Sequence, residues 1–228
     1  MFKETSKELL DFLSKSPTAF HAVENYRQIL NADGFKELLE SEHWDIVPGG
    51  KYYVTRNNTS ILAFKVGTKL DNYSFNIVTS HTDSPTFKVK ENAEIEVKNK
   101  YTQLNTEGYG GMLCATWLDR PLSIAGRVLV SEGNSIVTKL LNIDRDLLMI
   151  PNVAIHMNRA ANDGFKYNLQ VDMLPLLSAG DDRQKDFKQI IADELGVKKE
   201  DILGHDLYLY NRMAPSIWGA NEEFRSLR

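Results

Sequence analysis

The 228-residue sequence has little cysteine, no dense basic run and no long apolar run, and each shortage excludes a class of protein. Its single cysteine, Cys114, excludes an internal disulfide framework and every paired-cysteine metal or redox motif. The formal net charge of -4 gives no attraction for nucleic acid or an anionic membrane. No apolar stretch reaches membrane-spanning length, and the N-terminal residues carry charges where a signal peptide has its apolar core. We therefore expect a cytoplasmic protein without nucleic-acid or membrane partners.

Several enzyme motifs are also missing. The sequence has no Gly-x-Ser-x-Gly nucleophile elbow, no Gly-x-x-x-x-Gly-Lys phosphate loop and no His-Glu-x-x-His zinc helix. A glycine-rich stretch runs from Gly108 to Gly111, but it lacks the spaced third glycine and the preceding buried strand of a dinucleotide fingerprint. This stretch favours a turn.

The strongest local signal runs from Phe75 to Pro85. Residues Phe75 to Thr79 are apolar or β-branched and carry no charge, which predicts a strand buried on both faces and central in a sheet. His81 and Asp83 follow, so we expect the imidazole at the open end of the sheet with a carboxylate that fixes its tautomer. This pair is typical of a metal site, where a neutral imidazole binds zinc through one nitrogen and donates through the other. A chance occurrence of so short a pattern is the competing interpretation.

Residues 1 to about 90 predict two helices, a β-hairpin and the buried strand, the opening half of an α/β layer structure. The second helix is predicted to begin at Ser16-Pro17, and Asn57-Asn58 predicts a tight turn between the hairpin strands. His21 and Glu24 lie one turn apart on the second helix, a spacing that can hold a metal. Because the second histidine of an inverted zincin motif is missing, we interpret both as surface residues.

From Lys88 onward the pattern changes. Charged and apolar residues alternate, as in half-exposed antiparallel strands, and further β-rich runs follow. One helix is predicted at Asp186 to Leu195, closed by Gly196. We therefore predict a second, mainly β unit, with the boundary near residue 92.

Four stretches along the chain carry a family signature. They are Ser16-Pro17-Thr18-Ala19-Phe20-His21-Ala22-Val23, Ser80-His81-Thr82-Asp83-Ser84-Pro85, Gly108-Tyr109-Gly110-Gly111 with Thr116-Trp117-Leu118-Asp119-Arg120 and Leu122-Ser123-Ile124-Ala125-Gly126-Arg127-Val128, and Ile150-Pro151-Asn152-Val153-Ala154-Ile155-His156-Met157-Asn158-Arg159. Each stretch is a weak signal alone, but all four occur in the same order as in one protein family. Together they resemble the M18 family of metalloaminopeptidases, which includes the aspartyl aminopeptidases.

The resemblance implies a cytoplasmic, zinc-dependent aminopeptidase that releases N-terminal residues, acidic ones among them, from peptides at a two-zinc centre. It implies a zinc-exopeptidase-like α/β layer domain, interrupted by an inserted, mainly β dimerisation domain, in a homodimer or larger homo-oligomer. On this sequence we assign residues 1–92 to the N-terminal part of the α/β catalytic domain and 93–212 to the dimerisation domain. Residues 213–228 are then a truncated return to the catalytic domain.

The resemblance also assigns roles to three residues. His81 corresponds to a zinc ligand and Asp83 to the catalytic carboxylate that supports it. His156 corresponds to a substrate-site residue that reaches across the dimer to the partner's active site. Without the resemblance, a histidine satisfied inside a β-rich core is the preferred interpretation of His156.

The sequence also departs from the family pattern. In the family a bridging Asp, a pair of Glu residues, a further carboxylate and a final His follow the inserted domain, but this sequence reaches Arg228 without them. Cys114-Ala115 also replaces a more polar pair. We therefore expect the chain to be the N-terminal part of such an enzyme, inactive alone. The alternative is a non-catalytic oligomerisation or interaction module derived from such an enzyme, and a third hypothesis is a mononuclear hydrolase that uses His81 with His156 or His205.

Overall fold

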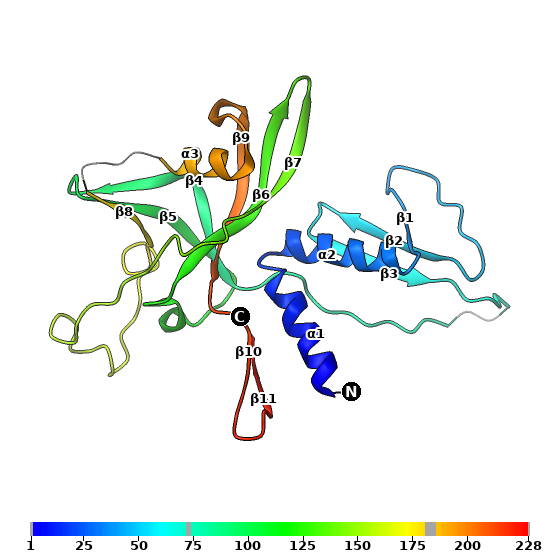
Figure 1. Cartoon of the computed structure of the whole chain (residues 1–228), viewed down its shortest axis with the longest axis horizontal. Helices are drawn as coiled ribbons and strands as arrows, with labels where there is room; N and C mark the ends of the chain where they lie inside the picture. Colours follow the sequence, from blue (N-terminus) through cyan, green and yellow to red (C-terminus); the bar gives the residue numbers. More distant parts are fainter. Residues whose placement is uncertain (1, 72–73, 181–185, 228) are drawn as a thin grey trace. The chain divides into compact units, whose positions relative to one another are not determined.

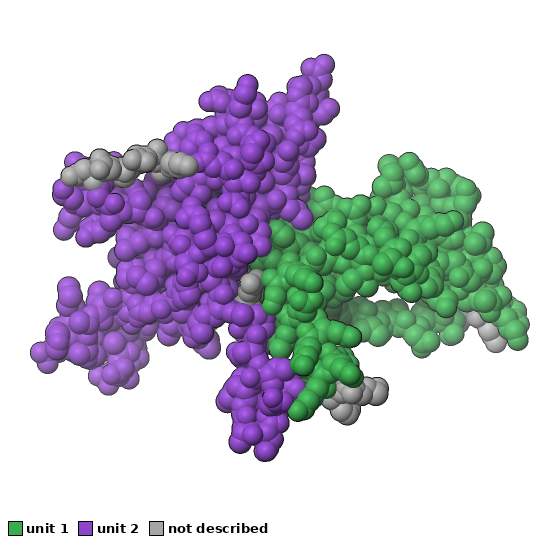
Figure 2. Space-filling view, in the orientation of Figure 1, with its two compact units in different colours: residues 1–84 green, residues 85–228 purple. Residues whose placement is uncertain are grey.

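The chain folds into two compact units that meet in the sequence between Ser84 and Pro85 (Figure 1, Figure 2). The computed structural model describes residues 2–71, 74–180 and 186–227. Within these ranges, no helix is long and apolar enough to cross a membrane. The sequence placed the boundary near residue 92, which lies inside strand β4 (Thr86–Val97). The α/β class is confirmed, with helices and a small sheet in the first unit and a larger antiparallel sheet in the second.

The first unit opens with helices α1 (Phe2–Ser14) and α2 (Ala19–Ala32). The N-cap of α2 is Thr18, so the start predicted at Ser16-Pro17 was two residues too early. The Ser16 hydroxyl accepts a hydrogen bond of 2.9 Å from the Asn25 side chain on the helix. The helix ends where the sequence predicted, just before Asp33 and the left-handed Gly34.

A three-stranded sheet follows, and it contains the predicted hairpin. The tight turn is confirmed at Asn57 and Asn58, whose φ angles of 53° and 54° are those of a type I′ turn. The strand order is β1-β2-β3, with β1 parallel to β2 and β2 antiparallel to β3. The strands are β1 (Lys36–Glu37), β2 (Lys51–Arg56) and β3 (Ser60–Lys65).

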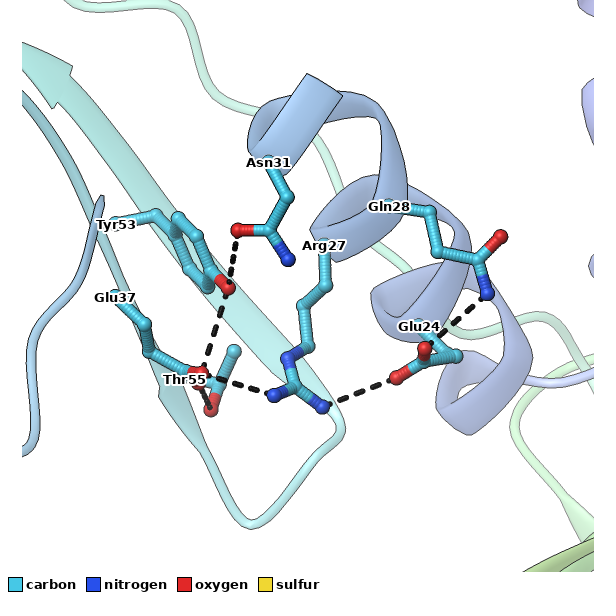
Figure 3. Close-up of polar contacts among 7 residues, drawn as sticks. All are labelled: Glu24, Arg27, Gln28, Asn31, Glu37, Tyr53 and Thr55. Atoms are coloured by element: carbon cyan, nitrogen blue, oxygen red, sulfur yellow. Dashed lines mark hydrogen bonds and ion pairs between the residues drawn. The ribbon is translucent and has the colours of Figure 1, made fainter. Parts of the chain in front are cut away.

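Polar contacts fix α2 to this sheet (Figure 3). The buried Tyr53 on β2 donates its hydroxyl proton to Asn31 Oδ1 at 3.0 Å. Arg27 on α2 donates to Glu37 on β1 at 2.8 Å and to Glu24 on its own helix at 3.0 Å. The hydrogen bond to Glu37 raises the pKa of Arg27, so the guanidinium stays charged. It thereby links α2 to β1.

The second unit is built on a six-stranded antiparallel sheet in the order β7-β6-β9-β4-β5-β8, with a separate hairpin β10-β11. At Gly126 the strands approach so closely that an added Cβ would lie 2.0 Å from the Asp206 carbonyl oxygen, which explains the glycine. The remaining elements are β5 (Tyr101–Tyr109), η1 (Cys114–Trp117), β6 (Leu122–Glu132), β7 (Ser135–Asn142), β8 (Leu176–Ala179), η2 (Lys199–Asp201), β9 (Ile202–Asn211), β10 (Ser216–Trp218) and β11 (Phe224–Ser226).

Helix α3 (Phe187–Leu195) covers part of this sheet (Figure 1). The predicted helix is confirmed. At its N-terminal end the Asp186 side chain accepts a hydrogen bond from the Gln189 amide at 2.8 Å, and at its C-terminal end Gly196 is left-handed. Phe187 and Ile191 are buried against the sheet core.

A three-membered ion cluster links side chains of three strands of this sheet. Asp206 on β9 contacts Lys88 on β4 at 2.9 Å and Arg127 on β6 at 2.8 Å. Burial alone would raise the pKa of Asp206, but the hydrogen bonds from Lys88 and Arg127 hold it below its ordinary value. The cluster joins three neighbouring strands.

Candidate metal-binding site

The segment that leads to His81 is exposed and forms no strand. The sequence predicted a strand buried on both faces at Phe75 to Thr79, and this prediction is wrong, because these residues form no strand and are exposed. The side chains of Phe75, Ile77 and Val78 are 82%, 76% and 97% exposed. A doubly buried strand needs neighbouring strands and covering layers, and in the described residues the sheet of this unit stops at β3. His81 therefore does not lie at the end of a sheet.

The contact expected between His81 and Asp83 is present. Nδ1 of His81 lies 2.8 Å from the Asp83 carbonyl oxygen and 3.2 Å from its carboxylate Oδ1. Both oxygens are acceptors, so a proton on Nδ1 is held there and Nε2 is left with its lone pair. The side chains are 79% and 49% exposed, which makes Nε2 accessible to a ligand.

A hydrogen bond places this loop beside the hairpin turn of the same unit. The hydroxyl of Thr82, between the two site residues, donates to the Thr59 carbonyl oxygen at 2.6 Å. Thr59 directly precedes β3. The local position of His81 is thus set by the β2-β3 turn rather than by the predicted strand.

These two side chains do not complete a zinc site. A catalytic zinc ion takes about three protein ligands and keeps one open position. Among the described residues, no three His, Cys, Asp or Glu side chains gather closely enough to hold a metal ion. A two-zinc centre therefore does not fit the side chains of the described residues alone.

The other predicted site residue, His156, lies in the second unit. It is exposed within residues 151–175, a segment of turns without helix or strand. Its neighbours Ile155 and Met157 are also exposed. The structure therefore brings His81 and Asp83 together, while His156 belongs to the other compact unit. His205, named in the third hypothesis, lies in the second unit as well, on β9.

His21 and Glu24 on α2 are less exposed than the sequence predicted. His21 is half-buried, and its Nδ1 lies 2.8 Å from the Thr18 hydroxyl. Burial lowers the pKa of His21 to about 4, so the imidazole is neutral at neutral pH. The interpretation of His21 as a surface residue is therefore wrong. Glu24 is also half-buried and contacts Arg27 rather than a metal-binding partner.

No sequence pattern indicated the cavity in the second unit, which is lined by apolar and charged residues of β4, α3 and β9. Glu91, Lys188 and His205 contribute to it from positions far apart in the chain. No motif connects such residues, so only the folded sheet reveals them.

The chain matches the sequence model of the family described as aminopeptidase I zinc metalloprotease (M18) over residues 12–227. It is 47% identical over 227 residues to a probable M18 family aminopeptidase 2 of Clostridium novyi (strain NT). This match covers 97% of this chain and 52% of the relative. The corresponding Clostridium acetobutylicum protein is also 47% identical, covering 98% of this chain and 53% of that protein. The chain thus spans about half the length of these curated relatives and matches their N-terminal part.

Solved structures agree with this relationship. The chain resembles a chain of the cryo-EM structure of the Ape4 and Nbr1 complex with a TM-score of 0.92 at 34% identity, covering 98% of this chain and 47% of that one. Chaetomium thermophilum mApe1 gives a TM-score of 0.88 at 29% identity, and the match covers 97% of this chain and 54% of that chain. The S. cerevisiae mApe1 dodecamer gives 0.78 at 26%, covering 97% and 51%.

Proposed function

The chain belongs to the M18 family of aminopeptidases, and we propose that it forms the His81-bearing part of a cytoplasmic, zinc-dependent enzyme that releases N-terminal residues, acidic ones among them, from peptides. The observation that carries the proposal is the contact between His81 and Asp83 inside a family motif. In this role His81 is a zinc ligand through Nε2, and Asp83 orients the ring.

In this proposal, residues equivalent to the part of the relatives that this chain does not match supply the remaining zinc ligands and the general base. Its support is the incomplete ligand set of the described residues, together with the relatives' greater length. The exposure of Phe75, Ile77 and Val78 agrees, since an added layer of the domain would cover these side chains. This chain alone is then inactive.

We further propose that the enzyme is a homo-oligomer that associates through residues 93–212, with His156 at a subunit boundary near the partner's substrate. The dodecamer formed by S. cerevisiae mApe1 supports this proposal. The exposed position of His156 also suits a role toward a neighbouring molecule. The outer strands of the second unit, β7 and β8, leave sheet edges that a partner can cover.

The experiment compares this chain alone with the same chain co-expressed with the remaining part of the C. novyi relative. Bound zinc and release of N-terminal residues are measured for both, with His81→Ala as the matched variant. The proposal expects activity only in the combined sample, lost in His81→Ala. A combined sample that associates but neither binds zinc nor cleaves peptides would instead favour a non-catalytic interaction module.

A further inference from the structure

A side-chain hydrogen bond holds the loop of His81 against the first unit. Residues 74–82 form no helix or strand, and their backbone makes no hydrogen bond to the backbone of any other described residue. The hydroxyl of Thr82 donates instead to the Thr59 carbonyl oxygen at 2.6 Å. Both threonines are half-buried, whereas His81 is exposed. The bond therefore joins the centre of an otherwise exposed loop to the hairpin.

The acceptor of this bond belongs to a tight turn. Asn57 and Asn58 have φ angles of 53° and 54°, a left-handed backbone that asparagine tolerates better than most residues. The Thr59 amide closes the turn by donating to the Arg56 carbonyl oxygen at 3.1 Å. Arg56 and Ser60 then pair across the two strands. The Thr59 carbonyl oxygen is thus held in one place relative to β2 and β3.

The two hydrogen-bonded contacts of this loop do different things. The contact between His81 and Asp83 spans only two residues, so it orients the ring within the loop wherever the loop lies. It cannot fix the loop relative to the sheet. The bond from Thr82 to Thr59 spans 23 residues and supplies that constraint.

We propose that Thr82 is a positioning residue, whose hydroxyl fixes the pair of His81 and Asp83 to the β2-β3 turn and so determines where Nε2 of His81 is presented. The inference rests on the proposed function, which makes His81 a site residue. A displacement of about 1 Å at a reacting centre can lower a rate about a hundredfold. A residue that touches no substrate can therefore still control the rate.

Backbone ¹⁵N relaxation of the whole chain, without metal or substrate, tests the role of Thr82. We expect an order parameter of about 0.85 for the His81 amide in the native chain and below about 0.6 in Thr82→Val, which removes the hydroxyl at nearly the same size. Thr82→Ser restores the hydroxyl and should return the native value. A native value below about 0.6, or equal values in the native chain and Thr82→Val, would overturn the proposal.

Thr116→Val is the control for the loss of a hydroxyl. It removes a comparable hydrogen bond of 2.7 Å, from Thr116 to the Leu113 carbonyl oxygen in the second unit. The order parameter of His81 should stay at its native value in this variant. A drop as large as that in Thr82→Val would show that the effect is not specific to the Thr82 bond.

A matched pair of turn variants tests the acceptor side. Asn58→Val places a β-branched residue in a left-handed backbone and should displace the turn. Asn99→Val does the same in the turn between β4 and β5, where Lys98 and Asn99 have φ angles of 51° and 52°. We expect the order parameter of His81 to fall only in Asn58→Val. Equal values in the two variants would contradict positioning by the β2-β3 turn.

A second readout connects the hydrogen bond to the reaction. In the sample that combines this chain with the remaining part of the C. novyi relative, Thr82→Val should slow peptide release at least about tenfold and Thr82→Ser should restore it. Release at the native rate by Thr82→Val would overturn the positioning role. If the native combined sample is inactive, the proposed function fails, while the order parameters of this chain still decide whether Thr82 fixes the loop.

Discussion

Nδ1 of His81 lies 2.8 Å from the carbonyl oxygen of Asp83 and 3.2 Å from its carboxylate. Both contacts involve the same ring nitrogen, so the opposite nitrogen is directed away from them and can meet a metal ion. A pair this local forms without a surrounding sheet, and the exposure of both side chains shows that it has done so here. The pair prepares one ligand, but a catalytic zinc site needs about three.

Acid should destabilise the first unit through His21. Its folded-state pKa is about 4, below the ordinary 6.5, so the unfolded chain binds more protons between these values. Stability is therefore highest above about pH 6.5 and falls as the pH drops toward about 4, by roughly 3 kcal/mol. Urea unfolding at several pH values, followed through the amide signals of α2, measures this change.

A matched pair of variants isolates this effect. His21→Gln keeps a neutral acceptor for Thr18 and should flatten the pH dependence in that window. His43→Gln, whose side chain is 93% exposed in the native protein, should leave the dependence unchanged. The assignment is wrong if both variants retain the wild-type slope.

Removing the charge of Asp206 should weaken the second unit. In Asp206→Asn the half-buried Lys88 and Arg127 lose their common partner, and we expect a loss of about 1–3 kcal/mol in the free energy of unfolding. Asp144→Asn is the control, because that carboxylate is 80% exposed at its contact with Arg212 and should cost less than about 1 kcal/mol. Chemical unfolding gives both values, and equal losses would contradict the role of the cluster.

The exposed apolar segment should be a source of association without contributing to stability. Ile77→Lys and Val78→Lys remove apolar side chains that are 76% and 97% exposed, so we expect less binding of an apolar dye and a change in unfolding free energy within about 0.5 kcal/mol. Val23→Lys in the same unit, at 1% exposure, should instead unfold it. A large loss of stability in the two loop variants would show that the segment is packed in solution.

Association of the chain is expected to involve residues 93–212. Light scattering over a range of concentrations should show a mass above 25.9 kDa that rises with concentration. Ile77→Lys and Val78→Lys separate this association from contacts of the exposed loop, because they leave the second unit unchanged. A concentration-independent monomer would count against the proposed interface.

Local chemistry made several parts of the fold predictable. The left-handed asparagines of the hairpin turn and the Asp186 and Gly196 ends of α3 depend on neighbours a few residues away. The contact between His81 and Asp83 is local for the same reason.

Burial was less predictable because it depends on distant parts of the chain. The apolar run after Ser74 has the composition of a central strand, but composition cannot supply the strands that would flank it. Likewise, His21 has a polar side chain on a helix, and only packing shows that it is half-buried. The cavity beside His205 joins three elements from separate regions, so its lining follows from sheet order rather than from any motif.

The most direct test of the central claim is metal-dependent release of N-terminal residues from acidic and neutral peptides by the purified chain. We expect no release by this chain alone, with or without added zinc. We expect release when residues equivalent to the rest of the C. novyi relative are supplied, and loss of that release in His81→Ala. Zinc-dependent release by the chain alone that disappears in His81→Ala would contradict the proposed function, because a complete site would then exist within residues 1 to 228.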